Sequence, residues 1–321
     1  MKAFFKSGIP QRLKDHAYYL KEKSAGFPKT KAFFQKMNGY PLDILNPQTH
    51  NQRIVHKMLT EKNPLLTITS DKVKVQDYIR ERLGANVAKD LLIPIYHISK
   101  TGMDIPVPPR GQEFFMKANH ASGFNKLINA DSNPTEIQKL AKYWLSQSFG
   151  QVSHAWAYRD IPRRILCEKV LRDENGSIPM DIKFYCFHGK VKMILFLKDR
   201  FNDASRIFTD ENLREIPGAQ MFGDKKLTPI PVHQNLEEMK KLSEKLAQDF
   251  NYCRVDLYSI QGKIYFGEIT HYTGAGIERF DDYATDLALG QLWLPENKDK
   301  SIFQILEAKQ SLEPTDAIEF S

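Results

Sequence analysis

The stretch RVDLYSIQGKIYFGEITH (residues 254–271) decides the fold, because it predicts two apolar strands joined by a tight turn. Each strand carries an acid in its middle, Asp256 on the first and Glu268 on the second. Ionised carboxylates on half-buried strands cost free energy unless a cation meets them. With Arg254 two residues before the first acid, the pair predicts a seat for a divalent metal that carries phosphate.

The turn between these strands decides whether the two acids meet. Residues alternate faces along a strand, so Arg254 and Asp256 share one face, and Glu268 and Thr270 share a face of the other strand. An odd-numbered loop containing Gly262 would set Asp256 directly across from Glu268, and would likewise set the arginine across from the threonine. A two-residue Gln-Gly loop would put the acids on opposite faces. The predicted site depends on the first register.

The composition is that of an ordinary soluble globular protein. The chain has 321 residues, enough for two or three modest domains, with 41% hydrophobic and 26% charged residues. No apolar run approaches the length of a membrane span, and we expect no secretion signal at the start of the chain. Cys167, Cys186 and Cys253 each sit in an apolar run, so we expect reduced, buried thiols in a cytoplasmic protein.

The net charge of +7 is compatible with several kinds of partner. Nucleic acid, a membrane surface, or nucleotide phosphates together with an anionic polymer would all attract a basic chain. The sequence has no basic tract of five or more residues and no recognisable nucleic-acid motif. We therefore expect no nucleic-acid partner, although charge alone does not separate these classes.

The order of elements predicts an α+β fold with mostly antiparallel strands, not the βαβ alternation of a doubly wound sheet. We divide the chain into a helical N-terminal segment (1–68), a small subdomain (69–163) and a large subdomain that contains the hairpin (164–321). The expected strands are 91–97, 113–120, 124–130, 165–171, 181–187 and 191–197. We expect one helix after the N-cap Asp71, one after the N-cap Asn133, and one over 236–250. A polar loop region is expected from 198 to about 234.

Several polar residues on the predicted strands could bind a nucleotide. Lys117 ends an apolar strand before a small-residue loop at 119–123, which fits a phosphate cradle or a lysine that snorkels to solvent. Residues 168–171 fit the amino edge of adenine, although an edge-strand charge pair is favoured for the tetrapeptide alone. Asp181 and Lys183 share a face of the next strand and leave the same two possibilities open.

The acids of the hairpin suit Mg²⁺, which takes one or two carboxylates and fills its octahedron with phosphate oxygens and water. The alternative is a cross-strand ionic network in which Arg254 satisfies both Asp256 and Glu268. We favour the metal, because two acids and one base leave an excess of negative charge. Tyr258 shares the face of Asp256, and His271 is expected to extend the polar face beyond the hairpin.

Five segments carry a resemblance to a known family. In chain order they are SDK (70–72), FFMKANHASG (114–123), ILCEKVL (165–171), DIKFYCF (181–187) and RVDLYSIQGKIYFGEITHYTGAG (254–276). Over roughly residues 60 to 280 the chain resembles the ATP-grasp superfamily, most closely its TupA-like branch from teichuronopeptide and other bacterial surface-polysaccharide gene clusters. The resemblance implies an ATP-grasp fold, in which two α+β subdomains with mostly antiparallel sheets sandwich ATP.

The resemblance also implies roles for particular residues in binding ATP and Mg²⁺. Arg254 would stabilise acyl-phosphate and tetrahedral species, with Lys117 as the second catalytic residue. Thr270 stands where the family usually has asparagine, so one metal position is expected to be bridged by water or lost. The implied ATP-binding residues are Lys72 and Lys117 at the phosphates, Ser122 and Gly123 in the loop over them, Glu168, Lys169 and Leu171 at adenine, and Asp181 at the ribose with Lys183 beside it; the implied metal ligands are Asp256, Glu268 and Thr270.

The expected activity is that of an ATP-dependent carboxylate–amine ligase, which forms an amide through an acyl phosphate. Family association suggests an acidic sugar or surface-polysaccharide precursor as the acid, an amino-acid-like amine, and peripheral association with polysaccharide assembly enzymes. Two alternatives stay open: an ATP-dependent phosphotransferase acting on a sugar or glycan hydroxyl, and a non-catalytic glycan-binding accessory protein. The sequence indicates neither the acid, nor the amine, nor the oligomeric state.

Overall fold

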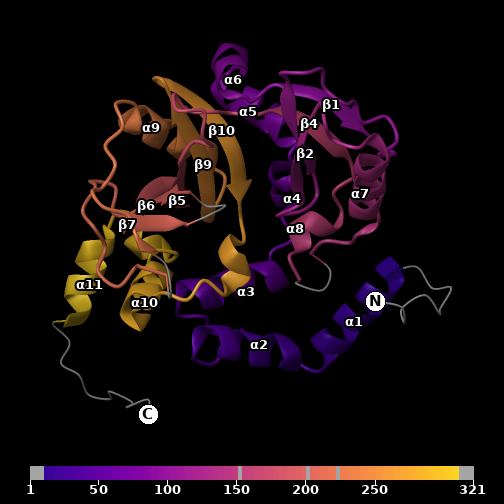
Figure 1. Cartoon of the computed structure of the whole chain (residues 1–321). Helices are drawn as coiled ribbons and strands as arrows, with labels where there is room; N and C mark the ends of the chain where they lie inside the picture. The colour runs from indigo at the N-terminus through magenta and orange to yellow at the C-terminus, as the bar shows by residue number, and fades with distance from the viewer. Residues whose placement is uncertain (1–10, 151–153, 200–202, 222–224, 311–321) are drawn as a thin grey trace.

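Two β-sheets built from different parts of the chain lie side by side in the molecule (Figure 1). The computed structural model describes residues 11–150, 154–199, 203–221 and 225–310. Within these residues the smaller sheet has the strand order β1-β4-β2-β3 and the larger sheet the order β10-β9-β5-β6-β7-β8. Strands β7 and β8 run parallel, and the other neighbouring strands of the described chain run antiparallel. The α+β fold expected from the sequence is confirmed.

Strand β4 brings a later part of the chain into the smaller sheet, where it pairs with β1 and β2. The expected division at residue 163 therefore falls before the last strand of that sheet, and the chain passes to the larger sheet only after Lys169. The three-part division as a whole stays a prediction. The strands are β1 (Ile95–Ser99), β2 (Glu113–Ala118), β3 (Asn125–Asn129), β4 (Ile165–Lys169), β5 (Asp181–Phe187), β6 (Lys190–Lys198), β7 (Ser205–Thr209), β8 (Lys225–Lys226), β9 (Tyr252–Ile260) and β10 (Lys263–Thr270).

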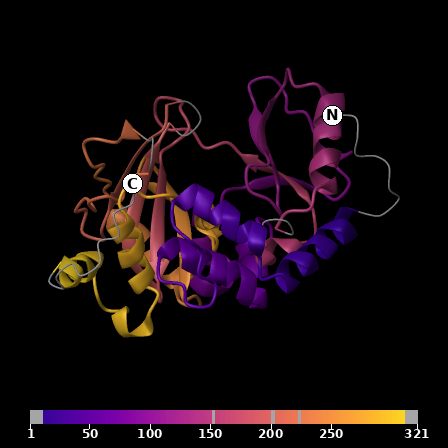
Figure 2. The ribbon, with the colours of Figure 1, turned by 90° about the horizontal axis from the view of Figure 1, so that it is seen from below.

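Helices from the N-terminal part of the chain run beneath both sheets (Figures 1 and 2). The expected helical segment over 1–68 stays a prediction, and its residues 1–10 lie outside the described chain; the helix that crosses its expected end, α4, ends at Ser70. The helices are α1 (Gln11–Ser24), α2 (Pro28–Asn38), α3 (His50–Thr60), α4 (Pro64–Ser70), α5 (Val75–Leu83), α6 (Ala85–Leu91), α7 (Pro134–Ser146), α8 (Trp156–Arg159), α9 (Leu236–Ala247), η1 (Thr273–Gly276), α10 (Tyr283–Gln291), η2 (Pro295–Asn297) and α11 (Ile302–Gln310).

Helix α7 begins where the sequence predicts. The Oδ1 atom of Asn133 accepts hydrogen bonds from the backbone N–H groups of Thr135 at 2.9 Å and Glu136 at 3.4 Å, and Pro134 occupies the first helical position. The apolar stripe of α7, which includes the buried Trp144, packs with the smaller sheet in a core of its own. This core holds strand β2 in place.

Asp71 is not the N-cap of the helix that follows it. It ends α4, and α5 begins only at Val75, after a turn. The Oδ1 atom of Asp71 accepts hydrogen bonds from the backbone N–H of Val73 at 2.9 Å and from the side-chain amide of Asn119 at 2.8 Å. Asp71 therefore ties the segment that carries Lys72 to the loop after β2, rather than starting a helix.

The region expected to be polar loop also contains two strands in its described part, β7 and the two-residue β8. Strand β7 pairs with β6 and buries Ile207 and Phe208, whereas residues 200–202 and 222–224 lie outside the described chain. Strand β7 is short and its last three residues are buried in succession, so the sequence shows no alternation there. Cys167, Cys186 and Cys253 are all buried and free, as expected for core thiols.

Candidate active site

The turn of the hairpin has two residues, so the expectation of an odd-numbered loop is wrong. Gln261 and Gly262 have φ values of 48° and 77°, as in the tight turns that match the twist of antiparallel strands. Carried along both strands, the register of this turn would pair Asp256 with Gly267. It would also turn Glu268 to the opposite face.

A β-bulge at Gly267 restores the predicted pairing. The register shifts by one residue there, so Glu268 lies directly opposite Asp256. Thr270 lies opposite Arg254 in the same shifted register. A Cβ atom on residue 267 would lie 3.0 Å from the carbonyl oxygen of Asp256, so this close approach of the strands needs glycine. The predicted pairing of Asp256 with Glu268 is confirmed, but a β-bulge produces it and not an odd-numbered loop.

Two cationic side chains surround Asp256 on one face of the larger sheet. The Nε and Nη2 atoms of Arg254 donate to its carboxylate oxygens at 2.7 and 2.8 Å. Lys183, directly opposite on β5, donates to Oδ2 at 2.5 Å. Burial acts to raise the pKa of Asp256, but Arg254 and Lys183 outweigh it, so its pKa lies below the usual range. Asp256 is a buried anion held between two cations.

Lys183 changes the charge balance expected from the sequence, which counts two acids against Arg254 alone. Its ammonium group bonds to Asp256 and also lies 3.4 Å from Oδ1 of Asp181. With Glu268, three acids and two bases share this face of the sheet. The ionic network that was the alternative to a metal is present, and one negative charge remains in excess.

Glu268 is the more open of the two hairpin acids. Its side chain is 40% exposed, whereas that of Asp256 is 4% exposed. Its Oε1 atom accepts a hydrogen bond from the Thr270 hydroxyl at 3.0 Å. Burial and the charge of Asp256 act to raise the pKa of Glu268, but Lys72, Arg254 and Lys183 together lower it below the usual range. Glu268 is therefore an accessible anion.

The smaller sheet and the turn between α4 and α5 supply cations that face these acids. Lys117 on β2 forms an ion pair with Glu168 on β4, so the two residues expected to bind different parts of a nucleotide bond to each other. The Nζ atom of Lys72 donates to the carbonyl oxygen of Ala121 at 2.8 Å. Burial lowers the pKa of Lys72, and the carboxylate of Glu268 acts in the opposite direction.

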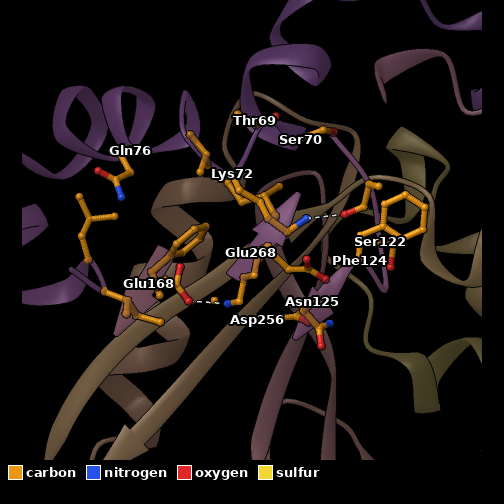
Figure 3. Close-up of a pocket in the computed structure, with 18 of the residues that line it drawn as sticks. Thr69, Ser70, Lys72, Gln76, Ser122, Phe124, Asn125, Glu168, Asp256 and Glu268 are labelled. Carbon is orange, nitrogen blue, oxygen red and sulfur yellow. Dashed lines mark hydrogen bonds and ion pairs between the residues drawn. The ribbon is translucent and has the colours of Figure 1, made fainter. Parts of the chain in front are cut away.

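A cavity of about 300 Å³ lies between the hairpin acids and the lysines Lys72 and Lys117, and we call it the central cavity (Figure 3). Lys72, Glu168, Asp256 and Glu268 surround one space in this view. A smaller space of about 40 Å³ shares Lys117 and Glu168 with it. The predicted residues that line the central cavity are Lys72, Lys117, Ser122, Gly123, Glu168, Asp181, Asp256 and Glu268. Those that line the smaller space are Lys117, Glu168, Lys169 and Leu171.

Three predicted residues line neither space: Lys183, Arg254 and Thr270. They bond to the two hairpin acids and hold them in place. In contrast, Tyr258 lines both spaces, and its hydroxyl donates to Oδ1 of Asp181 at 3.1 Å. The alternation of faces along β9 already indicated its direction.

Other lining residues carry no signal that the sequence could reveal. Tyr158 lies in the four-residue helix α8 and lines the central cavity with Thr69 and Ser70 from the end of α4. Burial raises the pKa of Tyr158, so its hydroxyl stays protonated. Short irregular segments of this kind reach the cavity only because the tertiary fold places them there.

His271 does not extend the polar face. Its side chain is fully buried on the other side of β10, where Nε2 lies 2.7 Å from the hydroxyl oxygen of Thr69 and the ring packs edge-on against Phe250. Burial holds the pKa of His271 well below its usual range, so the imidazole is neutral. Its contact helps to hold Thr69, which lines the central cavity, in place.

A comparison with protein families decides the affiliation of the chain. The profile of a family described as TupA-like ATP-grasp matches residues 52–294, which include both sheets and every residue of the predicted site. The chain belongs to the TupA-like ATP-grasp family. No curated protein matches the sequence.

Solved structures with some likeness to this TupA-like ATP-grasp chain include several ligases. A D-alanine–D-alanine ligase from Bacillus anthracis, complexed with ATP, is 14% identical, with 77% of this chain and 68% of that chain covered and a TM-score of 0.38. The VanG D-Ala:D-Ser ligase from Enterococcus faecalis is 12% identical, with 76% and 62% covered and a TM-score of 0.37. The ATP-grasp ligase PsnB, complexed with a variant of its minimal precursor, Mg and ADP, is 11% identical, with 65% and 51% covered and a TM-score of 0.35. At TM-scores below 0.5 we infer nothing about this chain from these likenesses.

The central cavity fits the nucleotide and metal that an ATP-grasp family implies. Its lysines suit phosphate, and its two opposed acids suit a magnesium ion that takes its other ligands from phosphate and water. In the described ranges no three His, Cys, Asp or Glu side chains gather in a way that could hold a metal by themselves. Such an ion would therefore depend on oxygens of the nucleotide.

Among the described helices, none is long and apolar enough to cross a membrane.

Proposed function

We propose that this chain is an ATP-dependent carboxylate–amine ligase that works through an acyl phosphate. One observation carries the proposal: acids on β9 and β10 and lysines near β2 line the same cavity from opposite walls. A triphosphate with its metal needs negative ligands on one side and positive ligands on the other. The central cavity supplies both within about 300 Å³.

Each wall would hold a different part of the nucleotide. Lys72 and Lys117 would grip the phosphates, with Ser122 and Gly123 in the loop above them. The smaller space, lined by Lys169 and Leu171 together with Glu168, would take the adenine, and Asp181 would bind the ribose. Glu168 has a second task in this proposal, because its ion pair keeps Lys117 directed along the cavity wall.

The hairpin would hold the metal. Glu268, the more exposed acid, would be its main protein ligand, with Asp256 as the second. When bound, magnesium would screen the charge of the phosphates and orient the terminal one for transfer. Thr270 would orient Glu268 through its hydroxyl rather than bind the ion, and Lys183 would hold Asp256.

The chemistry would consist of two displacements. A carboxylate oxygen of the acid attacks the terminal phosphorus, the bond to the ADP oxygen breaks, and ADP leaves. An amine then attacks the carbonyl carbon of the acyl phosphate, phosphate leaves, and the nitrogen loses a proton to solvent. Lys72 and Lys117 would stabilise the charge that develops on phosphate and carbonyl oxygens, and Arg254 would act through Asp256, which it holds, so positioning and electrostatics supply the rate. An acidic sugar or surface-polysaccharide precursor and an amino-acid-like amine are the proposed substrates.

The test is ADP release in a screen of acidic sugars crossed with amines. We expect turnover only when an acid and an amine are both present, and we expect Lys117→Ala to abolish it. Lys126→Ala is the matched control, because Lys126 is an exposed lysine on the neighbouring strand β3, outside the cavity. Amine-independent turnover with a stable phosphorylated product would instead indicate a phosphotransferase.

A further inference from the structure

A second cavity is lined by residues of the N-terminal helices, which run beneath the sheets in Figure 1, and by residues of the loop after α7 and of the segment after the hairpin. We call it the lower cavity. Its volume is about 570 Å³, and it shares no described lining residue with the central cavity. Phe34, Val55 and Met58 line it and are almost fully buried, whereas Phe33 lines it and is 53% exposed. An apolar cavity of this size with a few polar groups is typical of a small-molecule site.

The polar groups of the lower cavity are connected to one another. The Nζ atom of the exposed Lys29 lies 5.0 Å over the ring of Tyr18, and that ring stacks on His154 at 6.3 Å. The Nε2 atom of His154 lies 3.1 Å from the hydroxyl oxygen of Thr30. Among the described residues that line this cavity there is no carboxylate, and the nearby Glu22 accepts hydrogen bonds from the backbone N–H groups of Lys29 and Thr30. Asp15 is also buried, and its carboxylate accepts a hydrogen bond from the hydroxyl of the lining residue Ser148. Lys29 is the one Lys, Arg, Asp or Glu side chain among the described lining residues, so it is the group that would meet an anion.

The two cavities share an aromatic wall. The rings of Phe149, which lines the lower cavity, and Tyr158, which lines the central cavity, meet edge-on at 5.2 Å. Ala275 and Ile277 also line the lower cavity, a few residues after the end of β10, the strand that carries Glu268. A ligand in the lower cavity would therefore contact one ring of an aromatic pair whose other ring lines the central cavity.

We propose that the lower cavity binds an organic anion with an apolar, ring-shaped body, with its anionic group at Lys29. The apolar floor takes the body, the aromatic walls contact its ring, and the lysine meets the charge. Its role as the substrate pocket for the reaction rests on the function proposed above. The binding of such an anion does not, because it needs neither nucleotide nor metal.

The experiment measures the fluorescence of anilinonaphthalene sulfonate, an aromatic body with one sulfonate, titrated onto the folded protein without nucleotide. We expect one saturable site. Lys29→Glu should weaken it about fivefold, as expected for reversing one exposed charge next to the anion. The matched control is Lys263→Glu, because Lys263 also lies over a tyrosine ring, that of Tyr265 at 5.2 Å, but far along the hairpin from this cavity.

A second variant separates the two cavities. Phe33→Ala, at an exposed position, should weaken probe binding, and Lys117→Ala should leave it unchanged. Loss of binding in Lys117→Ala with none in Lys29→Glu would place the probe in the central cavity and overturn the proposal. Binding that appears only after removal of residues 1–10 would also overturn it, because that segment would then be the occupant. Absence of ligase turnover would refute the proposed function but leave this result standing.

Discussion

Glu268 lies directly opposite Asp256 only because one extra residue, a glycine, stands in β10 between the turn and Glu268. The two-residue turn sets one register and the bulge at Gly267 shifts it by one. Every residue beyond the bulge consequently changes face. The accessible acid of the site is thus placed by a local irregularity of the strand and not by the turn.

Replacing this glycine tests the bulge. Gly267→Ala puts a Cβ 3.0 Å from a backbone carbonyl oxygen and 3.1 Å from the ring of Tyr258, so the neighbouring strand and the ring must give way by a few tenths of an ångström. We expect a loss of about 1–3 kcal/mol in the free energy of unfolding, the usual cost of overpacking. Urea unfolding measures the loss, and Lys263→Ala on the same strand is the control. Unchanged stability together with unchanged nucleotide binding would show that the bulge is dispensable.

The two hairpin acids should respond differently to removal of their charge. Asp256→Asn leaves the buried Arg254 and Lys183 with only their longer ion pairs, to Glu268 at 3.5 Å and Asp181 at 3.4 Å, and breaking such a buried network typically costs about 3–5 kcal/mol. Glu268→Gln, at a side chain that is 40% exposed, should cost about 1 kcal/mol or less.

Glu268→Gln, which should cost little stability, should have a clear effect on nucleotide binding. We expect Glu268→Gln to lose the magnesium dependence of ATP affinity while the protein keeps its fold. Urea unfolding and calorimetric titration with and without magnesium measure both effects. A magnesium dependence that survives Glu268→Gln would argue that the hairpin does not hold the ion.

The ion pair between Lys117 and Glu168 should matter for nucleotide affinity. Glu168→Gln removes the charge that directs Lys117, so we expect ATP to bind about tenfold more weakly, as expected for about 1.4 kcal/mol. In the double variant with Lys117→Ala the further loss should be smaller than for Glu168→Gln alone. Additive losses in this cycle would mean that the two residues bind the nucleotide independently.

Buried histidines should make stability depend on pH. The folded pKa of His271 lies well below the unfolded value of about 6.5, so below that pH the unfolded chain takes up a proton that the folded chain does not. Stability is therefore full above pH 6.5 or so and falls as the pH drops, by up to about 1.4 kcal/mol per pH unit for each such group. His50 and His120, with pKa values lowered by burial to about 3 and about 4, act in the same direction.

One variant isolates the contribution of His271. His271→Gln can keep a hydrogen bond to Thr69 but cannot titrate, so the slope of stability against pH between 6 and 5 should shrink by about one proton. Urea unfolding at several pH values measures it. The same slope in wild type and variant would show that His271 titrates normally in the folded protein.

Much of the site can be predicted from the sequence, because local chemistry marks it. Asn133 and Pro134 predict the start of α7, alternation along β9 predicts the shared face of Arg254 and Asp256, and Lys117 before a small-residue loop is found in the wall of the central cavity. These signals depend only on neighbours in the chain.

The sequence by itself determined the α+β class, the strands that carry charge, and the residue types suited to a nucleotide and its metal, since periodicity and composition are local properties. The tertiary structure alone decided that Lys183 would bond to Asp256, that β4 would join the smaller sheet, that His271 would be buried, and that the N-terminal helices would line a second cavity. Each of these depends on contacts between segments far apart in the chain. Such contacts are selected by the packing of the whole core, which no short stretch of sequence specifies.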